Sequence, residues 1–258
     1  MDSVGRSQLN SLSFRPNAGD IKAPFQEEQE EQQEGSKDSF DESLRPAEEL
    51  DPEEEQEEGE RHEAELLEKY PLWHDQEAEE LLDMLFEQLL PRMARPGVDY
   101  DFLALDTDTP FASSCPNGAV YFSRGLLQEL SEGELLFFAA HELAHTELRH
   151  YATRQRRLAD LRQSIPAPVG SPTRQRLDQA AVLSVRHQEE FEADHQAGLW
   201  VDRSLAVQAL TTLHELCRRT SPKSLQRPTH PPFERRVALL KSGEPFPPIL
   251  QYLYSLVG

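Results

Sequence analysis

Residues 131–150 read SEGELLFFAAHELAHTELRH, and this stretch sets the architecture of the domain around it. Ser131 and Glu134 have the spacing of a capping box, and a long apolar run with helical periodicity follows them. The pattern predicts a helix that begins at Glu132 and continues towards Leu161. Because apolar residues surround this helix, we expect it to be buried in the core of a domain.

Two histidines four residues apart, His141 and His145, lie within that helix. Residues at this spacing differ by about 40° around a helix axis, so both imidazoles leave the same face and can bind one metal ion. Glu142 lies beside this face, where it can act as a general base without being a ligand. HExxH alone is a weak signal, but two adjacent buried imidazoles are costly unless they share an ion.

A catalytic zinc site usually has three protein ligands and one open position, so a third ligand is needed. The metzincin pattern is excluded, because Leu148 and Tyr151 occupy the positions of its glycine and its third histidine. His150 lies five residues after His145, which predicts that its ring points about 140° away and that it caps or packs the helix end.

A carboxylate on a later helix, predicted over roughly Arg176 to Asp202, is the better candidate for the third ligand. Residues 190–194 read EFEAD. We expect Glu190 to bind the metal and Asp194, one turn later, to accept the outer N–H of a ligating histidine. Glu192 is predicted to point elsewhere. Three further histidines are interpreted as structural or surface residues: His187, His195 and His214.

The other elements predict an α+β protein that is mainly helical. We expect a helix around Leu81 to Leu90, strands at Val98–Leu105 and Ala119–Ser123 around a turn-rich segment, a surface loop at 164–173, helices at about Leu205–Arg218 and Phe233–Leu240, and an apolar C-terminal tail that packs onto the domain.

The charge is concentrated near the N-terminus. Residues 20–70 contain 21 acidic and 5 basic side chains, which gives −16 of the formal net charge of −21. Few large apolar groups accompany these charges, so we predict that residues 1 to about 70 are disordered and that 71–258 form the catalytic domain. Three roles stay open for the tail: a solvated segment, an inhibitory pro-segment that covers the cleft, or a docking site for a basic partner.

Composition also limits the compartment and the partners. Two cysteines, Cys115 and Cys217, are too few for a disulfide framework, which favours a reducing compartment. The longest apolar run, Leu135–Ala140, is far below membrane-spanning length, and no export signal begins the chain. We therefore expect a soluble, cytoplasmic protein without an integral membrane segment, and peripheral membrane association stays open. Strong acidity argues against nucleic acid as a partner.

Three spaced motifs resemble the gluzincin family of zinc peptidases that includes HtpX and the CAAX prenyl endopeptidases. The resemblance covers roughly residues 99–240, and its motifs are HELAHTELRH (141–150), EFEAD (190–194) and THPPFERR (229–236). It implies a zincin-like fold in which a small β-sheet with an edge strand lies over a two-helix zinc site. One Zn²⁺ per chain would be held by His141, His145 and Glu190.

The resemblance also implies roles for other residues. His230 would point into the cleft, where it and Arg236 could stabilise an oxyanion, although both could instead only fix their loop. The segment PNGAVYFSRGLL (116–127) resembles the family's edge strand and the short helix that follows it. We therefore expect substrate to bind in extended form by backbone hydrogen bonds to Ala119, Val120 and Tyr121.

Together these features predict a zinc-dependent endopeptidase that hydrolyses peptide bonds of soluble or unfolded proteins, with Glu142 as the general base. The best-known members of the family carry transmembrane helices beside the zinc site, whereas the connection between His150 and Glu190 here is a polar loop. Membrane-embedded substrates are therefore not expected. The alternative is a zinc-binding regulatory protein that keeps the fold, turns over nothing and uses the acidic tail as its contact surface.

Overall fold

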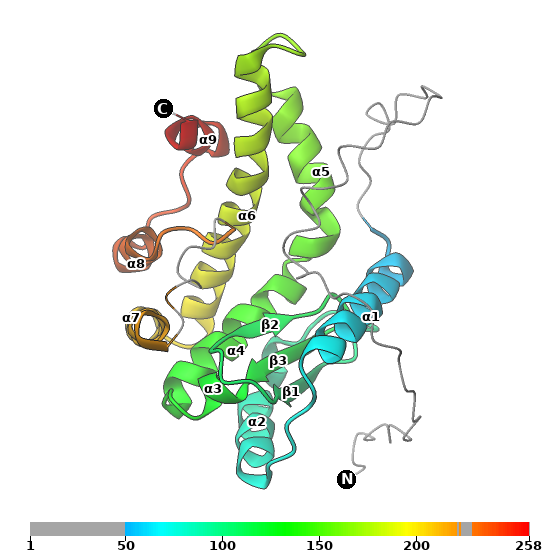
Figure 1. Cartoon of the computed structure of the whole chain (residues 1–258), viewed down its shortest axis with the longest axis vertical. Helices are drawn as coiled ribbons and strands as arrows, with labels where there is room; N and C mark the ends of the chain where they lie inside the picture. The colour runs from blue at the N-terminus through cyan, green and yellow to red at the C-terminus, as the bar shows by residue number, and fades with distance from the viewer. Residues whose placement is uncertain (1–49, 221, 223–228, 258) are drawn as a thin grey trace. The chain divides into compact units, whose positions relative to one another are not determined.

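A computed structural model describes residues 50–220, 222 and 229–257 of the chain (Figure 1). The predicted α+β, mainly helical class is confirmed. Along the chain the elements are α1 (Pro52–Lys69), α2 (Gln76–Leu89), the 3₁₀ turn η3 (Leu90–Arg92), β1 (Asp101–Leu105), β2 (Ala112–Ser114), β3 (Ala119–Ser123), α3 (Arg124–Leu127), α4 (Glu132–Glu147), α5 (His150–Gln163), α6 (Pro172–Trp200), α7 (Arg203–Thr220), α8 (Phe233–Ser242) and α9 (Ile249–Val257).

The three described strands form one small mixed sheet in the order β1-β3-β2. β3 pairs in parallel with β1 and antiparallel with β2, and all five of its residues are buried. The expectation that residues 119–121 offer a free edge to substrate is therefore wrong, since both edges of β3 are occupied. The edge strand beside α4 is β2, which the sequence analysis missed because ASS (112–114) is too short and polar to show strand alternation.

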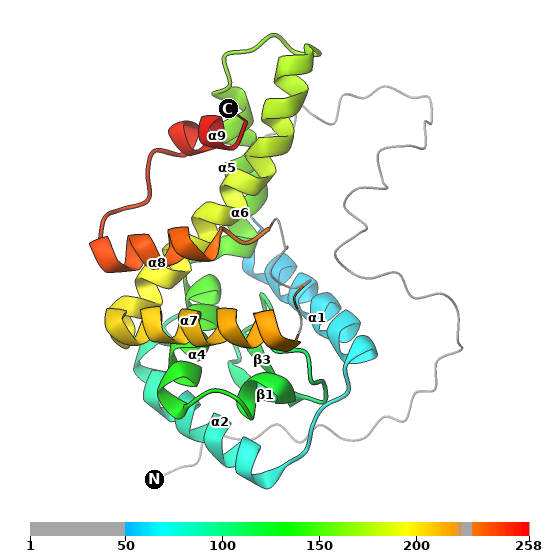
Figure 2. The same cartoon turned by 60° about the vertical axis from the view of Figure 1, so that its left-hand side comes forward.

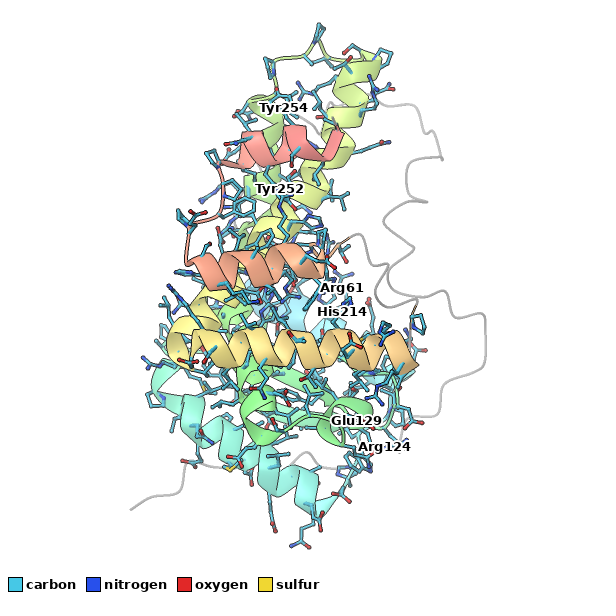
Figure 3. All side chains as sticks on the ribbon, turned by 90° about the vertical axis from the view of Figure 1, so that its left-hand side faces the viewer. Arg61, Arg124, Glu129, His214, Tyr252 and Tyr254 are labelled. Atoms are coloured by element: carbon cyan, nitrogen blue, oxygen red, sulfur yellow. The ribbon has the colours of Figure 1, made fainter. Side chains whose placement is uncertain are left out.

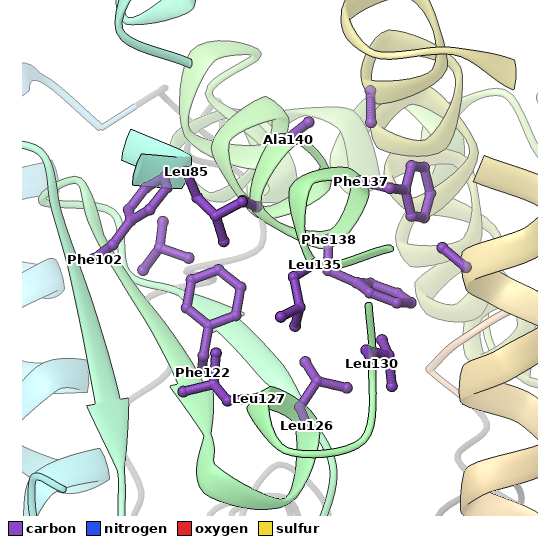
Figure 4. Close-up of a cluster of buried hydrophobic side chains, with 14 of the residues drawn as sticks. Leu85, Phe102, Phe122, Leu126, Leu127, Leu130, Leu135, Phe137, Phe138 and Ala140 are labelled. Atoms are coloured by element: carbon purple, nitrogen blue, oxygen red, sulfur yellow. The ribbon is translucent and has the colours of Figure 1, made fainter. Parts of the chain in front are cut away.

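Each face of the sheet packs against helices. Phe102 and Phe122 point from one face into the main core, where Leu85 of α2 and Leu135 of α4 meet them (Figure 4). Residues at the alternate positions of the strands point to the opposite face, which α1 covers with apolar groups from its C-terminal half. The central strand is thus buried on both sides, and α4 packs against the sheet.

Helix α1 occupies part of the segment that we predicted to be disordered. Asp51 caps it and forms a capping box with Glu54, and Pro52 stands at its first position, so the local signals for a helix start are strong. The acidic residues near its start also complement the helix dipole. The prediction of disorder up to residue 70 is therefore wrong for residues 52–69, while its remainder, residues 1–49, lies outside the described residues.

The charged side chains of α1 take part in its docking. Glu63 accepts a hydrogen bond of 3.0 Å from the side-chain amide of Asn117, and Glu58 accepts one from the hydroxyl of Tyr151. Gly59 allows the close approach, because a Cβ there would lie 2.3 Å from the backbone nitrogen of Asn117. Burial of acidic groups against polar partners explains why hydrophobicity alone did not predict this helix.

The helix predicted to run from Glu132 to Leu161 is broken in the structure. α4 ends before Arg149, whose backbone is left-handed with φ 54° and ψ 39°, and α5 begins at the next residue. Such a conformation costs energy for a residue that is not glycine. Contacts with the α1 segment hold it, because the Arg149 guanidinium donates to the backbone oxygen of Leu50 at 2.7 Å and to the Glu55 carboxylate at 3.3 Å.

The C-terminal half of the domain is organised by α6. α5 and α6 form a long hairpin around the predicted surface loop, and α7, α8 and α9 cross α6 one after another (Figure 2). The expectation that the C-terminal tail packs onto the domain is confirmed, because Tyr252 and Leu253 of α9 are fully buried. Among the described helices, none combines the length and the apolar character needed to cross a bilayer.

Candidate metal centre

Three side chains from two helices converge where α4 crosses α6. The Nε2 atoms of His141 and His145, one turn apart on α4, lie 3.2 Å from each other. Each of these nitrogens lies 3.7 Å from one carboxylate oxygen of Glu190 on α6. One possible ligand atom from each residue falls within 4.8 Å of the other two, so the three groups could hold one metal ion.

The donor set fits zinc. Nitrogen and oxygen ligands at about 2.0–2.1 Å from a tetrahedral zinc ion lie about 3.3 Å from one another, close to the separations at this site. Glu190 Oε2 is buried and has no hydrogen-bond partner among the described residues. An orphaned carboxylate oxygen beside two facing imidazole nitrogens is costly unless a cation joins them.

Asp194 lies behind His141, as the sequence predicts. Its Oδ1 is 3.1 Å from His141 Nδ1, and Arg236 of α8 donates hydrogen bonds of 2.7 and 2.6 Å to its two oxygens. Burial alone would raise the pKa of Asp194, but the charge and hydrogen bonds of Arg236 outweigh it and hold the pKa at about 2. Asp194 is therefore an ionised carboxylate beside the outer nitrogen of His141.

His150 lies behind His145, which corrects the prediction that its ring points away from that residue. The turn at Arg149 brings His150 back towards α4, so its Nδ1 lies 2.9 Å from His145 Nδ1 and its ring is only 1% exposed. Glu192, predicted to point elsewhere, lies 3.1 Å from His150 Nε2 and accepts a hydrogen bond of 2.8 Å from Arg157. The prediction for His150 assumed one straight helix, and no local signal reveals the turn, whereas Glu192 points away from the candidate ligand atoms as predicted and reaches His150 instead.

The candidate base contacts the edge strand. Glu142 Oε2 accepts a hydrogen bond of 2.9 Å from the hydroxyl of Ser114 on β2. Desolvation raises the pKa of the Glu142 carboxyl, and the nearby Glu190 carboxylate adds to that rise. Ser114 could not be predicted as a site residue, since nothing in ASS (112–114) marks its second serine as a neighbour of Glu142.

The two residues of the THPPFERR motif also reach this centre. His230 Nε2 lies 3.8 Å from Glu190 Oε1, and the side chain is 41% exposed. The side chain of Arg236 is 11% exposed, and its Nη1 lies 3.6 Å from Glu190 Oε2. Burial would raise the pKa of Glu190, but the charges of His230 and Arg236 outweigh it and lower the pKa.

The other predicted site residues lie elsewhere. Ala119, Val120 and Tyr121 are buried in the central strand and do not face the candidate metal centre with a free edge. His187 is buried with its Nδ1 2.6 Å from the Tyr252 hydroxyl, so its structural interpretation holds. His214 of α7 (Figure 3) stacks on Phe233 of α8, with ring centroids 4.3 Å apart.

Comparison with known proteins supplies a second line of information. The model of a protein family, described as peptidase family M48, matches residues 76–244, well over half of the chain. The matched segment begins at the start of α2 and extends just beyond α8, so it includes the sheet and all three candidate metal ligands. No curated protein matches the chain.

Proposed function

The chain belongs to peptidase family M48, and we propose that it is a zinc-dependent endopeptidase whose metal is held by His141, His145 and Glu190. The observation that carries the proposal is the convergence of these three donors from two helices within 4.8 Å. Membership of the family supports a metalloprotease with protein or peptide substrates. The zinc ion itself, the assignment of the base and the substrate class go beyond family membership.

When bound, the zinc ion would acidify a water molecule and polarise the scissile carbonyl group. Glu142 then accepts a proton from the attacking water and delivers it to the leaving amine, so no covalent intermediate is needed. The Ser114 hydroxyl donates to this carboxylate and fixes its direction. Arg236 and His230, both near Glu190, are suited to stabilise negative charge that develops on the carbonyl oxygen.

The edge strand β2 is the proposed docking site for substrate. It is the terminal strand of the sheet and lies beside α4, and Ser114 within it contacts the proposed base. An extended peptide can add to such an edge by backbone hydrogen bonds, which are independent of side-chain identity. We therefore expect endopeptidase action with weak sequence preference on unfolded proteins.

Replacement of the base tests the reaction. We expect Glu142→Gln to lower the rate of casein cleavage by about 10²–10⁴-fold, because general base catalysis typically contributes that much. Zinc content, measured by mass spectrometry, should stay at the wild-type level in this variant and be lost in Glu190→Ala. Glu215→Gln, in an exposed pair with Arg218 on α7, is the matched control and should change neither quantity.

The same measurements separate the two candidate functions. A regulatory zinc protein would bind one zinc ion per chain, lose it in Glu190→Ala, and cleave no unfolded protein in any form. Cleavage of casein by Glu142→Gln at the wild-type rate would contradict the assigned base. Full zinc content in Glu190→Ala would contradict the proposed ligand set.

A further inference from the structure

We propose that His150 and Glu192 are positioning residues that fix the tautomer and orientation of the candidate ligand His145, and so determine how tightly the metal binds. The inference rests on the proposed metal site and deepens it. Neither residue is a candidate ligand, and both act through His145. Their role follows from which atom donates and which accepts in the hydrogen bonds that join Glu192, His150 and His145.

The donor and acceptor of each hydrogen bond follow in turn from Glu192, which lies farthest from the candidate metal site. Glu192 is paired with Arg157, and a carboxylate can only accept, so His150 Nε2 must donate across the 3.1 Å contact. In the neutral imidazole the other nitrogen, Nδ1, then carries a lone pair. Across the 2.9 Å contact His145 Nδ1 must therefore donate. The lone pair of His145 is left on Nε2, the atom that faces His141 and Glu190.

The opposite tautomer of His145 would place a proton on the atom that has to bind the metal. Two forms of a free imidazole are close in energy, and the acceptor on the far nitrogen selects between them. His150 is therefore the acceptor that makes His145 ready to bind. It also fixes the plane of the ring, because the two imidazoles meet edge to face with centroids 4.9 Å apart.

The two candidate histidine ligands are supported in parallel ways. His141 faces a carboxylate directly, Asp194, which Arg236 holds in place. His145 reaches its carboxylate through one intervening imidazole, and Arg157 holds that carboxylate in place. The contacts behind each candidate ligand thus lead to a carboxylate that an arginine holds in place. The longer of these two series of contacts passes through His150.

Metal affinity of the full chain tests the inference without an activity assay. We expect His150→Phe, which keeps a ring but removes the acceptor, to weaken Zn²⁺ binding about 10–100-fold, measured by competition with a chelator of known affinity. His150→Asn places an amide oxygen near the former Nδ1 and should restore most of the affinity. The visible spectrum of the Co²⁺-loaded protein should change in the Phe variant and be largely restored in the Asn variant.

Two further variants guard against a simple loss of folding. His187→Phe removes a buried histidine of α6 whose Nδ1 contacts the Tyr252 hydroxyl of α9, and it should leave Zn²⁺ affinity unchanged. Glu192→Ala acts at a partly exposed position and should weaken Zn²⁺ binding in the same direction as His150→Phe. Circular dichroism of the metal-free proteins reports whether each variant folds.

The possible results are distinct. Wild-type affinity in His150→Phe or Glu192→Ala would overturn the inference, as would equal losses in His150→Phe and His150→Asn, which would indicate packing alone. The proposed function fails separately, if the wild-type chain binds no Zn²⁺ or if His145→Ala binds it as tightly as wild type does.

Discussion

The hydrogen bond from Ser114 to Glu142 joins the edge strand to the proposed base, so a single hydroxyl helps to orient the carboxylate of that base. A carboxylate that moves protons must point at the water it activates, and most of its torsional freedom is lost when one oxygen is held. Ser114 contributes this constraint from β2, the strand to which substrate is proposed to add. The position of the base is thus tied to the position of the peptide.

We predict that Ser114→Ala lowers kcat about tenfold and leaves KM unchanged. A hydrogen bond to a charged group contributes about 1.5–3 kcal/mol, and the lower end of that range corresponds to about one factor of ten in rate. Steady-state kinetics on a fluorogenic peptide measure both constants. Ser114→Thr should retain the rate, and Ser113→Ala on the same strand is the control; a raised KM with normal kcat would contradict the assigned role.

At the residue scale, the sequence predicts the groups whose placement follows from one helix. His141, Glu142 and His145 are related by the period of α4, and the pairing of Asp194 with His141 follows from the period of α6. His150 could not be placed in this way. Its position depends on the left-handed turn at Arg149, which is held by contacts with a distant part of the chain.

Among the elements, α1 supports the segment next to the candidate metal centre through its contacts with Arg95 and Arg149. The Glu55 carboxylate is only 3% exposed and accepts hydrogen bonds of 3.0 and 2.6 Å from Arg95. Arg95 also donates at 2.9 Å to the backbone oxygen of Thr146 in the last turn of α4, while Arg149 at the break contacts the same carboxylate. One buried acidic group therefore holds the junction that orients His145 and His150.

We predict that Glu55→Ala lowers the free energy of unfolding by about 3–5 kcal/mol, because two arginines are left beside an empty position in a buried site. Urea denaturation measures the change. Glu57→Ala, at an exposed position of the same helix, should change it by less than about 0.5 kcal/mol. Equal stability of the two variants would mean that the Glu55 ion pairs contribute nothing net.

A shortened chain that begins at Pro71 tests the role of α1 as a whole. We expect it to be less stable and less active than the full chain, since it lacks the contacts that hold the turn at Arg149. Casein cleavage at equal zinc occupancy and thermal unfolding measure the two effects. Higher activity in the short form would instead identify the N-terminal segment as an inhibitory pro-segment.

The elements were predictable where apolar periodicity defines them, as in α2, α4, α6 and α8. α1 could not be recognised in this way, because its burial uses Glu55, Glu58 and Glu63 as hydrogen-bond and ion-pair acceptors. The order of the strands in the sheet could not be predicted from the sequence either. The resemblance of residues 116–127 to a family segment led to the expectation that β3 is the edge, whereas strand order depends on long-range pairing that composition does not encode.

At the scale of the whole molecule, the proposed zinc ion would act as a cross-link between α4 and α6. An ion that binds only the folded chain stabilises it by about 2.7 kcal/mol when its free concentration is 100 times Kd. We therefore predict that 1,10-phenanthroline lowers Tm by several degrees and that added zinc restores it. The Tm of His145→Ala should not change with either reagent. A wild-type Tm that also stays unchanged with both would argue against a tightly bound metal.

The centre is assembled from segments that leave the ribosome far apart in time. α4 emerges first, Glu190 follows with α6, and Arg236, which anchors Asp194, arrives only with α8. A nascent chain that has exposed only its HELAH segment has neither its third donor nor the arginine behind it. The order of synthesis therefore means that the candidate metal centre and the arginine behind it cannot be complete before α8 has been made.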